Sequence, residues 1–170
     1  MERKGYFCTS KYYFRMEKLL IITPVKDSIQ TTLDTIHAIM ESGISVPCTY
    51  TIYNDNSTPE NTAILEKEAE KYGFRLVNIS DLTDHPSPNY LLVLQRAQEE
   101  ALAQNAGLCI VESDVTVKPD TLQRLFDGAK ARKDCGIAAA VTVDESGAIN
   151  YPYLYAKGHE NQEYETRKHC

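Results

Sequence analysis

The stretch at residues 108–114 constrains the fold more than any other part of this 170-residue chain. Apolar residues follow one another from Leu108 to Val111, and the run then ends at Glu112 and Asp114, two acids with one residue between them. An apolar run without alternation predicts a strand that is buried on both faces, as in a parallel sheet covered by helices. The sequence therefore predicts an α/β fold with two acids at the carboxyl end of a buried strand.

The two acids can be interpreted in two ways. Alternate residues of an extended strand point to the same side, so we expect the carboxylates of Glu112 and Asp114 to face one spot. Like charges held close together repel unless a cation or hydrogen-bond donors join them, which favours a divalent metal with a phosphate on its far side. Alternatively, Asp114 caps the next helix and Glu112 is solvated at the strand end. This stretch alone leaves both interpretations open.

Apolar strands alternate with amphipathic helices along most of the chain. We expect strands at residues 19–23, 50–53, 75–79, 108–114 and 136–143, the last in a hairpin with residues 148–151. We expect helices at residues 29–40, capped by Asp27 and Ser28, at 59–72 and 90–104, and from residues 118–120 onward. This alternation predicts a mostly parallel, Rossmann-like sheet flanked by helices. Residues 1–15 are predicted to precede this α/β domain, which spans residues 16–156, and residues 157–170 to form a polar tail.

Composition excludes several classes of protein. The net charge of −6 argues against a nucleic-acid surface. No apolar run approaches the roughly 20 residues that a membrane span needs, and the first fifteen residues show no signal peptide. The five cysteines are scattered and form no C-x-x-C pair, which is typical of reduced thiols in a cytoplasmic protein.

Polar residues follow three of the predicted strands, at residues 23–27, 54–58 and 112–114. The carboxyl ends of parallel strands meet at one edge of the sheet, where ligands of such sheets bind. The sequence contains neither a glycine-rich dinucleotide loop nor a P-loop lysine. Any nucleotide at this edge would therefore be held by side chains and a metal.

Two of these segments resemble motifs of the family-2 glycosyltransferases, which have the GT-A nucleotide-sugar fold. Pro24-Val25, directly after the first strand, is similar to the opening P-V of that family. The second strand runs into a segment that resembles the D-D-x-S motif, with Asn54 in place of the first acid and Asp55 as the second. The resemblance covers residues 16–155 and implies the same fold for this chain.

Two further motifs follow in the order that the family has. Glu112-Ser113-Asp114 resembles the D-x-D motif, with Glu112 for the first aspartate. Residues 117–122 resemble the proline-led helix that follows D-x-D, and Arg96 stands in the preceding helix, where many members carry an arginine.

The resemblance implies roles for the matched residues. The backbone of Thr23, Pro24 and Val25 would lie along the base and ribose of a nucleotide, and Asp55 would hydrogen-bond the base. Arg96 would either contact a phosphate or remain a solvated helix residue.

The D-x-D-like motif would hold the cation. Asp114 would ligate Mg²⁺ or Mn²⁺ bridging the diphosphate, Glu112 would reach the ribose or the metal, and Ser113 would belong to the same nucleotide contact. A hard cation fits one or two carboxylates together with phosphate oxygens and waters. Such a cation would stabilise the charge that develops on a nucleoside diphosphate leaving group.

The activity implied is an inverting transfer of a sugar from a nucleotide-diphosphate sugar, with a uridine diphosphate sugar expected, to an unknown saccharide or lipid-linked acceptor. Inverting transfer needs a carboxylate that deprotonates the acceptor hydroxyl. No residue after Val143 matches the family's motif for that base, and Asp144 and Glu145 are expected to be turn formers. The catalytic residue therefore stays unassigned. The chain is predicted to be truncated on its C-terminal side and to hold mainly the donor half.

The predicted location is the cytoplasm, either free or peripheral to the inner face of the membrane. A truncated sheet would leave apolar surface near residues 151–155, so a homo-oligomer is a further expectation. Two other classes of protein match the sequence less well. A sugar-phosphate nucleotidyltransferase would carry a Gly- and Arg-rich loop after the first strand, and residues 23–28 have neither. A non-catalytic α/β regulatory module would carry paired acids after that strand, where Asp27 stands alone.

Overall fold

The computed structural model describes residues 16–133, 135–144 and 146–148. The chain divides into two compact units, Met1–Gly136 and Ile137–Cys170. Every helix and strand of the described residues belongs to the first unit. None of the helices in this part of the chain has the length and apolarity of a membrane span.

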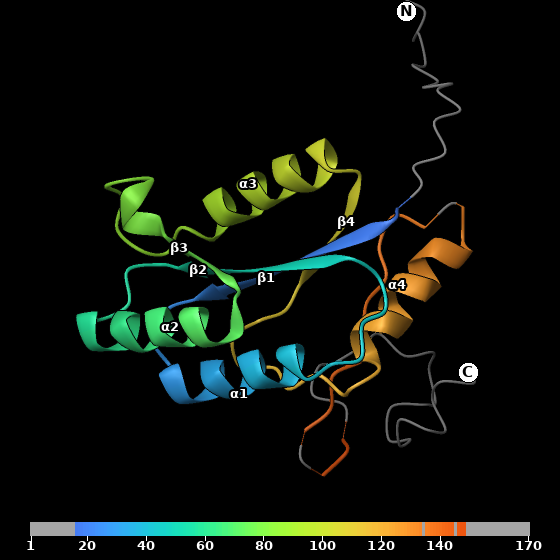
Figure 1. Ribbon diagram of the computed structural model, residues 1–170, viewed down its shortest axis with the longest axis horizontal. Helices are drawn as coiled ribbons and strands as arrows, with labels where there is room; N and C mark the ends of the chain where they lie inside the picture. The colour runs from blue at the N-terminus through green and yellow to red at the C-terminus, as the bar shows by residue number, and fades with distance from the viewer. Residues whose placement is uncertain (1–15, 134, 145, 149–170) are drawn as a thin grey trace, which may run out of the picture. The chain divides into compact units, whose positions relative to one another are not determined.

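The first unit is built on a four-stranded sheet in which each pair of neighbouring strands is parallel (Figure 1). Its order is β3-β2-β1-β4. The strands are β1 (Lys18–Val25), β2 (Cys48–Asn54), β3 (Arg75–Asn78) and β4 (Ala106–Ile110). The predicted α/β class with a parallel sheet flanked by helices is therefore confirmed.

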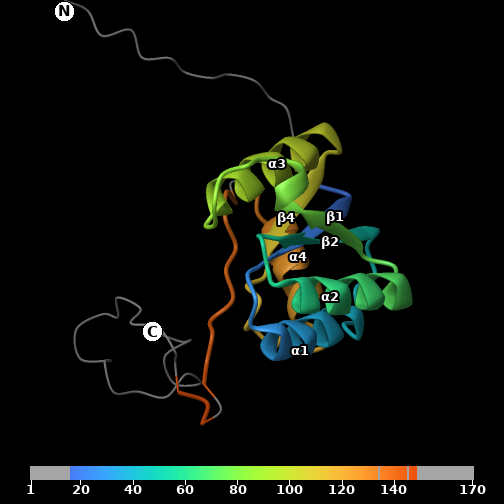
Figure 2. The same ribbon diagram turned by 90° about the vertical axis from the view of Figure 1, so that its left-hand side faces the viewer.

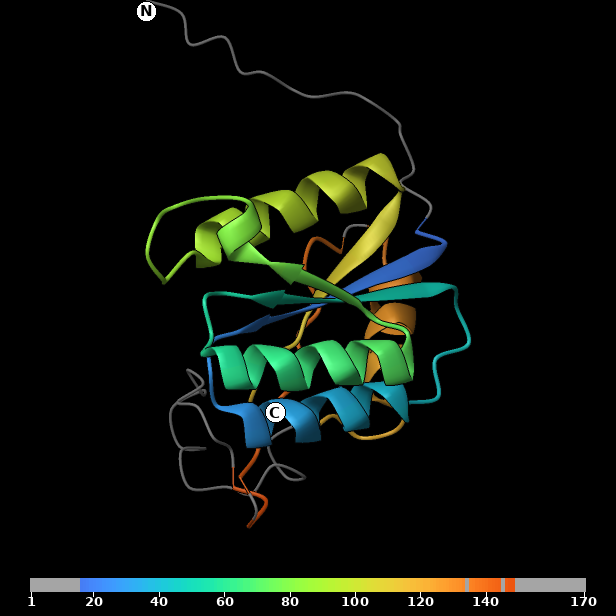
Figure 3. The same cartoon turned by 60° about the vertical axis from the view of Figure 1, so that its left-hand side comes forward.

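Helices cover both faces of this sheet (Figures 2 and 3). One face carries α1 (Ile29–Met40), α2 (Pro59–Tyr72) and α4 (Thr121–Ala131), and the other carries α3 (Tyr90–Ala103) and the short 3-10 helix η1 (Ile79–Asp81). Each face has its own core, and both cores draw on alternate residues of β1, as the period of a strand requires. The α1 side includes Leu19, Ile21, Val25, Ile36, Ile52, Leu65, Leu122 and Phe126. The α3 side includes Leu20, Ile22, Tyr53, Ile79, Val93, Ala97 and Ala101.

The strand predicted at residues 108–114 is shifted toward the N-terminus in the structure and is shorter. β4 begins at Ala106, ends at Ile110 and has one neighbour, β1, among the described strands. Ile110 is 43% exposed, so the expected burial on both faces is wrong at the end of the strand. An apolar run cannot distinguish a central strand from an outer one, because burial is set by the elements that pack around it.

Pro24 explains why β4 ends early. We expected β1 to end before this proline, but β1 continues to Val25, which pairs with Asn54 of β2. The carbonyl of Ile22 accepts a hydrogen bond of 2.9 Å from the amide of Val111 and thus faces β4. Backbone groups two residues apart on a strand face the same neighbour, so Pro24 also faces β4. It has no N–H to donate there, and the β1–β4 ladder stops.

The fifth strand predicted at residues 136–143 is wrong. Residues 136–142 have no regular structure, and Val143 forms an isolated bridge. Ile137 is 90% exposed. Apolar composition alone does not decide whether a segment becomes a strand, because the tertiary context overrides it. The predicted turn is present, because the amide of Asp144 donates to the carbonyl of Ala148 at 2.8 Å. The rest of the expected hairpin partner lies outside the described residues.

Candidate functional site

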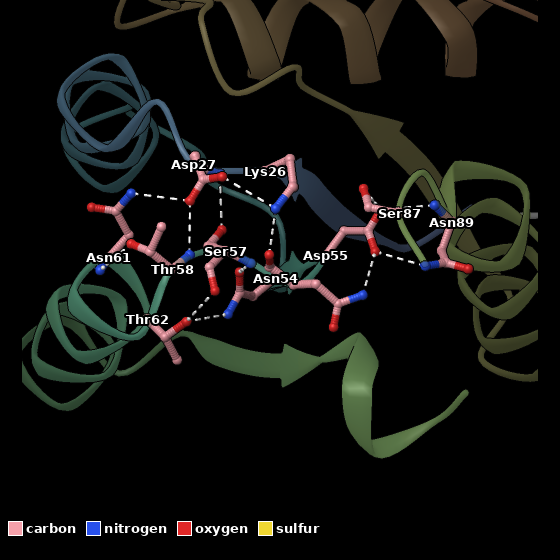
Figure 4. A network of polar contacts seen from close by, with 11 residues as sticks. Lys26, Asp27, Asn54, Asp55, Ser57, Thr58, Asn61, Thr62, Ser87 and Asn89 are labelled. Atoms are coloured by element: carbon pink, nitrogen blue, oxygen red, sulfur yellow. Dashed lines mark hydrogen bonds and ion pairs between the residues drawn. The ribbon is translucent and has the colours of Figure 1, made fainter. Parts of the chain in front are cut away.

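The segments that follow β1, β2 and β4 meet at one edge of the sheet. Because these three strands are neighbours and parallel, their carboxyl ends lie side by side. Asp27 follows β1, Asp55 follows β2, and Glu112 and Asp114 follow β4. The topology thus brings together the three polar segments that the sequence placed at a common edge, and Figure 4 shows the polar network around the first two.

Asp55 is the centre of one half of this network. Its side chain is buried, and both of its oxygens accept hydrogen bonds from the segment that precedes α3 (Figure 4). Oδ2 accepts from the Ser87 hydroxyl and from the amide of Asn89, each at 2.7 Å. Oδ1 accepts from Nδ2 of Asn89 at 2.8 Å and, at 3.4 Å, from Nδ2 of Asn56. These four donors fill the acceptor capacity of a carboxylate.

The environment of Asp55 favours the ionised form. Burial by itself would raise the pKa of this carboxyl, but the hydrogen bonds from Asn89 and Ser87 outweigh burial and hold the pKa below its ordinary value. Asp55 therefore carries a negative charge that the segment before α3 stabilises.

Asn54, which stands where the family has its first acid, is used inside the fold. It is 3% exposed, and its Nδ2 donates to Oγ1 of Thr62 at 3.0 Å and to Oδ1 of Asn78 at 2.9 Å. Its Oδ1 accepts from the amide of Ser57 at 3.3 Å. An amide can donate and accept at once, whereas an ionised carboxylate can only accept. The departure from the family pattern thus ties β2 to α2 and β3.

Asp27 and Lys26 form the other half of the network. We expected Asp27 and Ser28 to cap α1, but neither does: Ser28 is the residue at the N-cap and makes no side-chain cap. The Asp27 carboxylate instead accepts from the amide of Thr58 at 2.8 Å and from Nδ2 of Asn61 at 3.2 Å, both at the start of α2. These bonds, together with the nearby Lys26, lower the pKa of Asp27.

The backbone conformation explains why Asp27 contacts the start of α2 and does not cap α1. Asp27 and Ser28 have φ angles of 53° and 47°, in the left-handed region that residues with a Cβ seldom adopt. Asn56, across the network, has a φ of 57°, and its carbonyl accepts a hydrogen bond from Nζ of Lys26. Left-handed residues thus follow the ends of two neighbouring strands, and hydrogen bonds between the segments after β1 and β2 hold them in place.

Thr23, Pro24 and Val25 lie in the sheet. The Thr23 side chain is buried and accepts a hydrogen bond from the Tyr50 hydroxyl at 3.0 Å, and Val25 is buried on the α1 side. Pro24 is half-buried. Because the side chains of Thr23 and Val25 are buried, the backbone is the part of this segment that suits a ligand contact, as the resemblance implied.

Glu112, Ser113 and Asp114 lie in a turn after β4. Glu112 and Asp114 are exposed, and Ser113 is half-buried. The expectation that the two carboxylates share one side assumed an extended strand, which this segment is not. Glu112 Oε1 accepts a hydrogen bond of 2.7 Å from the Tyr90 hydroxyl. The carboxylate of Asp114 makes no hydrogen bond or ion pair within the described part of the chain.

The described residues fit a cation that arrives with a ligand better than a resident one. Nowhere in the described ranges do three or more His, Cys, Asp or Glu side chains gather into a possible metal site. A hard cation that keeps waters and binds phosphate oxygens needs only one or two carboxylates from the protein. Asp114, which is exposed and whose carboxylate has no partner among the described residues, meets that requirement.

Arg96 is exposed on α3, in the second turn of the helix. It makes no hydrogen bond or ion pair among the described residues, but it lies close enough to Tyr53 to influence the pKa of that phenol. The structure thus leaves both of its proposed roles, phosphate contact and solvated residue, as predictions.

Sequence reasoning missed four residues of this edge: Lys26, Ser87, Asn89 and Tyr90. The segment before α3 was predicted only as a loop, although it contacts both Asp55 and Glu112. These contacts join residues 22 to 34 positions apart, and no local pattern marks them. Tyr90 at the first position of a helix is also unremarkable in sequence.

Fold and site together define a parallel α/β protein with acids gathered at the carboxyl edge of its sheet. The chain matches no family model and no curated protein. Among solved structures it is similar to S. aureus TarS 1-349, with 19% identity over 66% of this chain and 33% of that chain and a TM-score of 0.46. The same protein in complex with UDP-GlcNAc gives 20% identity over 66% and 32%, again with a TM-score of 0.46.

A second similar structure is the mannosyltransferase PcManGT from Pyrobaculum calidifontis in complex with GDP-Man and Mn²⁺. Its identity is 18% over 64% of this chain and 31% of that chain, with a TM-score of 0.48. The chain thus spans about a third of the length of the structures it resembles.

Proposed function

We propose that the carboxyl edge of the sheet binds a nucleotide-diphosphate sugar and that the chain provides the donor-binding part of an inverting, family-2-like glycosyltransferase. One observation carries this proposal. β1, β2 and β4 are adjacent, so the segments that resemble the family's P-V, D-D-x-S and D-x-D motifs lie at one edge. Sequence order does not require these segments to be spatial neighbours; the sheet order makes them so.

In this proposal the base and ribose lie along the backbone of residues 23–25, and the base approaches Asp55. The carboxylate of Asp55 has one weak bond, the 3.4 Å contact from Asn56. An N–H of the base takes that acceptor position, while the shorter bonds from Ser87 and Asn89 remain. Because Asp55 is held ionised by its other donors, it is a strong acceptor for such a contact.

The diphosphate lies on the β4 side of the edge. Asp114 is the protein ligand of Mg²⁺ or Mn²⁺, and the cation, when bound, stabilises the charge of the nucleoside diphosphate leaving group. Glu112 and Ser113 stand beside it, with Glu112 near the ribose or the metal. Arg96 is a further candidate for the phosphates.

The acceptor side and the general base are not assigned to any residue. The acceptor is a saccharide or a lipid-linked acceptor in this proposal, and self-association into a homo-oligomer belongs to the proposal as well. A cytoplasmic location fits the free thiols of Cys48 and Cys109. Burial raises the pKa of the Cys109 thiol to about 11, which keeps it unreactive.

Calorimetric titration of the full chain with UDP tests the proposal. We expect binding in the presence of Mn²⁺ and little in EDTA, and we expect Asp114→Asn to reduce binding to the level seen in EDTA. Asp34→Asn, the same change at an exposed position on α1, is the matched control and is expected to bind like the wild type.

Two results would point to the other classes of protein. A clear preference for UTP over both UDP and UDP-sugars would favour a nucleotidyltransferase. Absence of nucleotide binding at millimolar concentrations, with or without metal, would favour a non-catalytic module and would refute the proposal.

A further inference from the structure

The segment at residues 87–90 contacts two of the acids at the edge of the sheet, Asp55 and Glu112. Ser87 and Asn89 donate three hydrogen bonds to Asp55, which follows β2. The next residue, Tyr90, donates through its hydroxyl to Glu112, which follows β4. β2 and β4 are not neighbours, since β1 lies between them. This segment therefore spans β1 and links the acids on its two sides.

The position of Tyr90 is fixed from two directions. Asn89 is the N-cap of α3 and Tyr90 its first residue, so the attachment of Asn89 to Asp55 also holds the start of the helix. The buried face of α3 packs on the sheet through Val93, Ala97 and Ala101. A rigid helix anchored along its face and at its first turn leaves the Tyr90 backbone little freedom, although the residue as a whole is 41% exposed.

The contact with Glu112 acts on the turn that carries Asp114. The carbonyl of Glu112 accepts a hydrogen bond from the amide of Val115 at 3.3 Å, which closes this turn, and the amide of Val111 is held by Ile22. Tyr90 adds an attachment from outside, through the Glu112 side chain. Partial burial and the adjacent Glu112 raise the pKa of the Tyr90 phenol to about 12, so the hydroxyl remains a donor at neutral pH.

From this arrangement we infer that Tyr90 is a positioning residue, which holds Glu112 and thereby fixes the turn at residues 111–115. Of the two carboxylates in this turn, Asp114 is then the one that is open to a cation. The inference rests on the proposed function for its ligand, a nucleoside diphosphate with its metal. The placement of the turn itself is independent of that function.

Tyr90→Phe tests the inference in the full chain, because it removes one oxygen and keeps the ring. Tyr72→Phe on α2 is the matched control. Hydrogen–deuterium exchange of residues 111–117 is the first measurement. We expect at least threefold faster exchange in Tyr90→Phe and in Glu112→Ala, and no change in Tyr72→Phe. Equal unfolding temperatures for the two Phe variants would show that the effect is local.

A double-mutant cycle with UDP and Mn²⁺ is the second measurement. Tyr90→Phe is expected to weaken binding about three- to tenfold, the range for one net hydrogen bond. In the Glu112→Ala background it should have no further effect, because Tyr90 acts through Glu112. Losses that multiply, or unchanged exchange in Tyr90→Phe, would overturn the inference. If the wild type binds no nucleotide, the proposed function fails, and the exchange measurement still decides whether Tyr90 positions the turn.

Discussion

At the carboxyl edge of the sheet, the hydrogen-bond donors and acceptors of each side chain matter as much as its charge. Asn54 and Asp55 are adjacent in sequence, and both are buried. The Asn54 amide donates hydrogen bonds to β3 and α2. The Asp55 carboxylate is an acceptor and binds the segment before α3. The resemblance to a family motif gave a ligand role to Asp55 and marked Asn54 as a departure from the motif. The structure shows in addition that each organises a different neighbouring element, which the motif alone could not indicate.

Asn54→Asp tests the role of the amide. The substitution places a buried carboxylate opposite Oδ1 of Asn78, which already acts as an acceptor. We expect the free energy of unfolding at pH 7 to fall by about 1–3 kcal/mol, the cost of a buried group without its partner. The loss should diminish as the pH falls, because a protonated acid can donate again. Denaturant unfolding measures both effects.

Asn105→Asp is the matched control for this prediction. Asn105 is exposed and has a φ of 51°, a conformation that aspartate also tolerates. The unfolding free energy of the Asn105→Asp variant should stay within about 0.5 kcal/mol of that of the wild type at every pH, as is usual for a surface substitution. A similar loss in both variants would mean that the Asn54 amide has no special role.

Asp55 predicts a pH dependence of stability. Its pKa is lower in the folded chain than in the unfolded one, so its contribution is complete above the unfolded value of about 3.9 and is lost as the pH falls through the folded pKa. Asp55→Asn should lower the unfolding free energy by about 1–3 kcal/mol at pH 7. Below pH 4 the unfolding free energies of the wild type and of Asp55→Asn should converge. Parallel curves from pH 7 to pH 3 would contradict this.

At the scale of elements, sequence patterns located the helices better than β4 and the segment at residues 136–143. The apolar spacing of residues 29–40 and the Pro59 start of α2 agree with the observed helices. These signals are local, because a helix makes its hydrogen bonds within itself. The end of β4 depends instead on Pro24, more than eighty residues earlier, and the irregular structure of residues 136–142 depends on their tertiary context. Neither could be deduced from the segment itself.

The N-cap residues of α1 and α2 give a prediction at this scale. The Thr58 side chain accepts a hydrogen bond from the amide of Asn61 and caps α2, whereas the Ser28 side chain makes no cap at α1. Thr58→Ala should therefore cost about 1 kcal/mol of unfolding free energy, and Ser28→Ala much less. Urea unfolding of the two variants measures the difference. A larger loss for Ser28→Ala would show that the hydroxyl has a partner in solution.

At the scale of the molecule, the parallel sheet and its common carboxyl edge followed from the alternation of strands and helices. The order β3-β2-β1-β4 did not, yet it decides that the segments after β1, β2 and β4 are neighbours. The network that joins them could not be foreseen either. Its hydrogen bonds run between segments that only the folded sheet brings together, such as Asp27 with Thr58 and Tyr90 with Glu112.

The last prediction separates donor binding from sugar transfer. Transfer needs a base within hydrogen-bond reach of the acceptor hydroxyl. Asp144, the first of the two acids that directly follow Val143, is engaged in its own turn: its Oδ1 accepts from the Ser146 hydroxyl and amide and from the amide of Ala148. The bond from the Ser146 side chain, followed by those from backbone amides, lowers the pKa of Asp144, which makes the carboxylate a weaker base.

We therefore expect the 170-residue chain to bind UDP and UDP-sugars with Mn²⁺ but to transfer sugar to saccharide acceptors slowly or not at all. Donor hydrolysis and transfer are assayed separately on the full chain, with Asp114→Asn as the variant that abolishes both. Asp144→Asn should leave donor binding and any residual transfer unchanged, because its carboxylate serves the turn. Robust transfer by the wild type that is lost in Asp144→Asn would place the acceptor base at Asp144, and the assignment of this residue to turn formation alone would then be wrong.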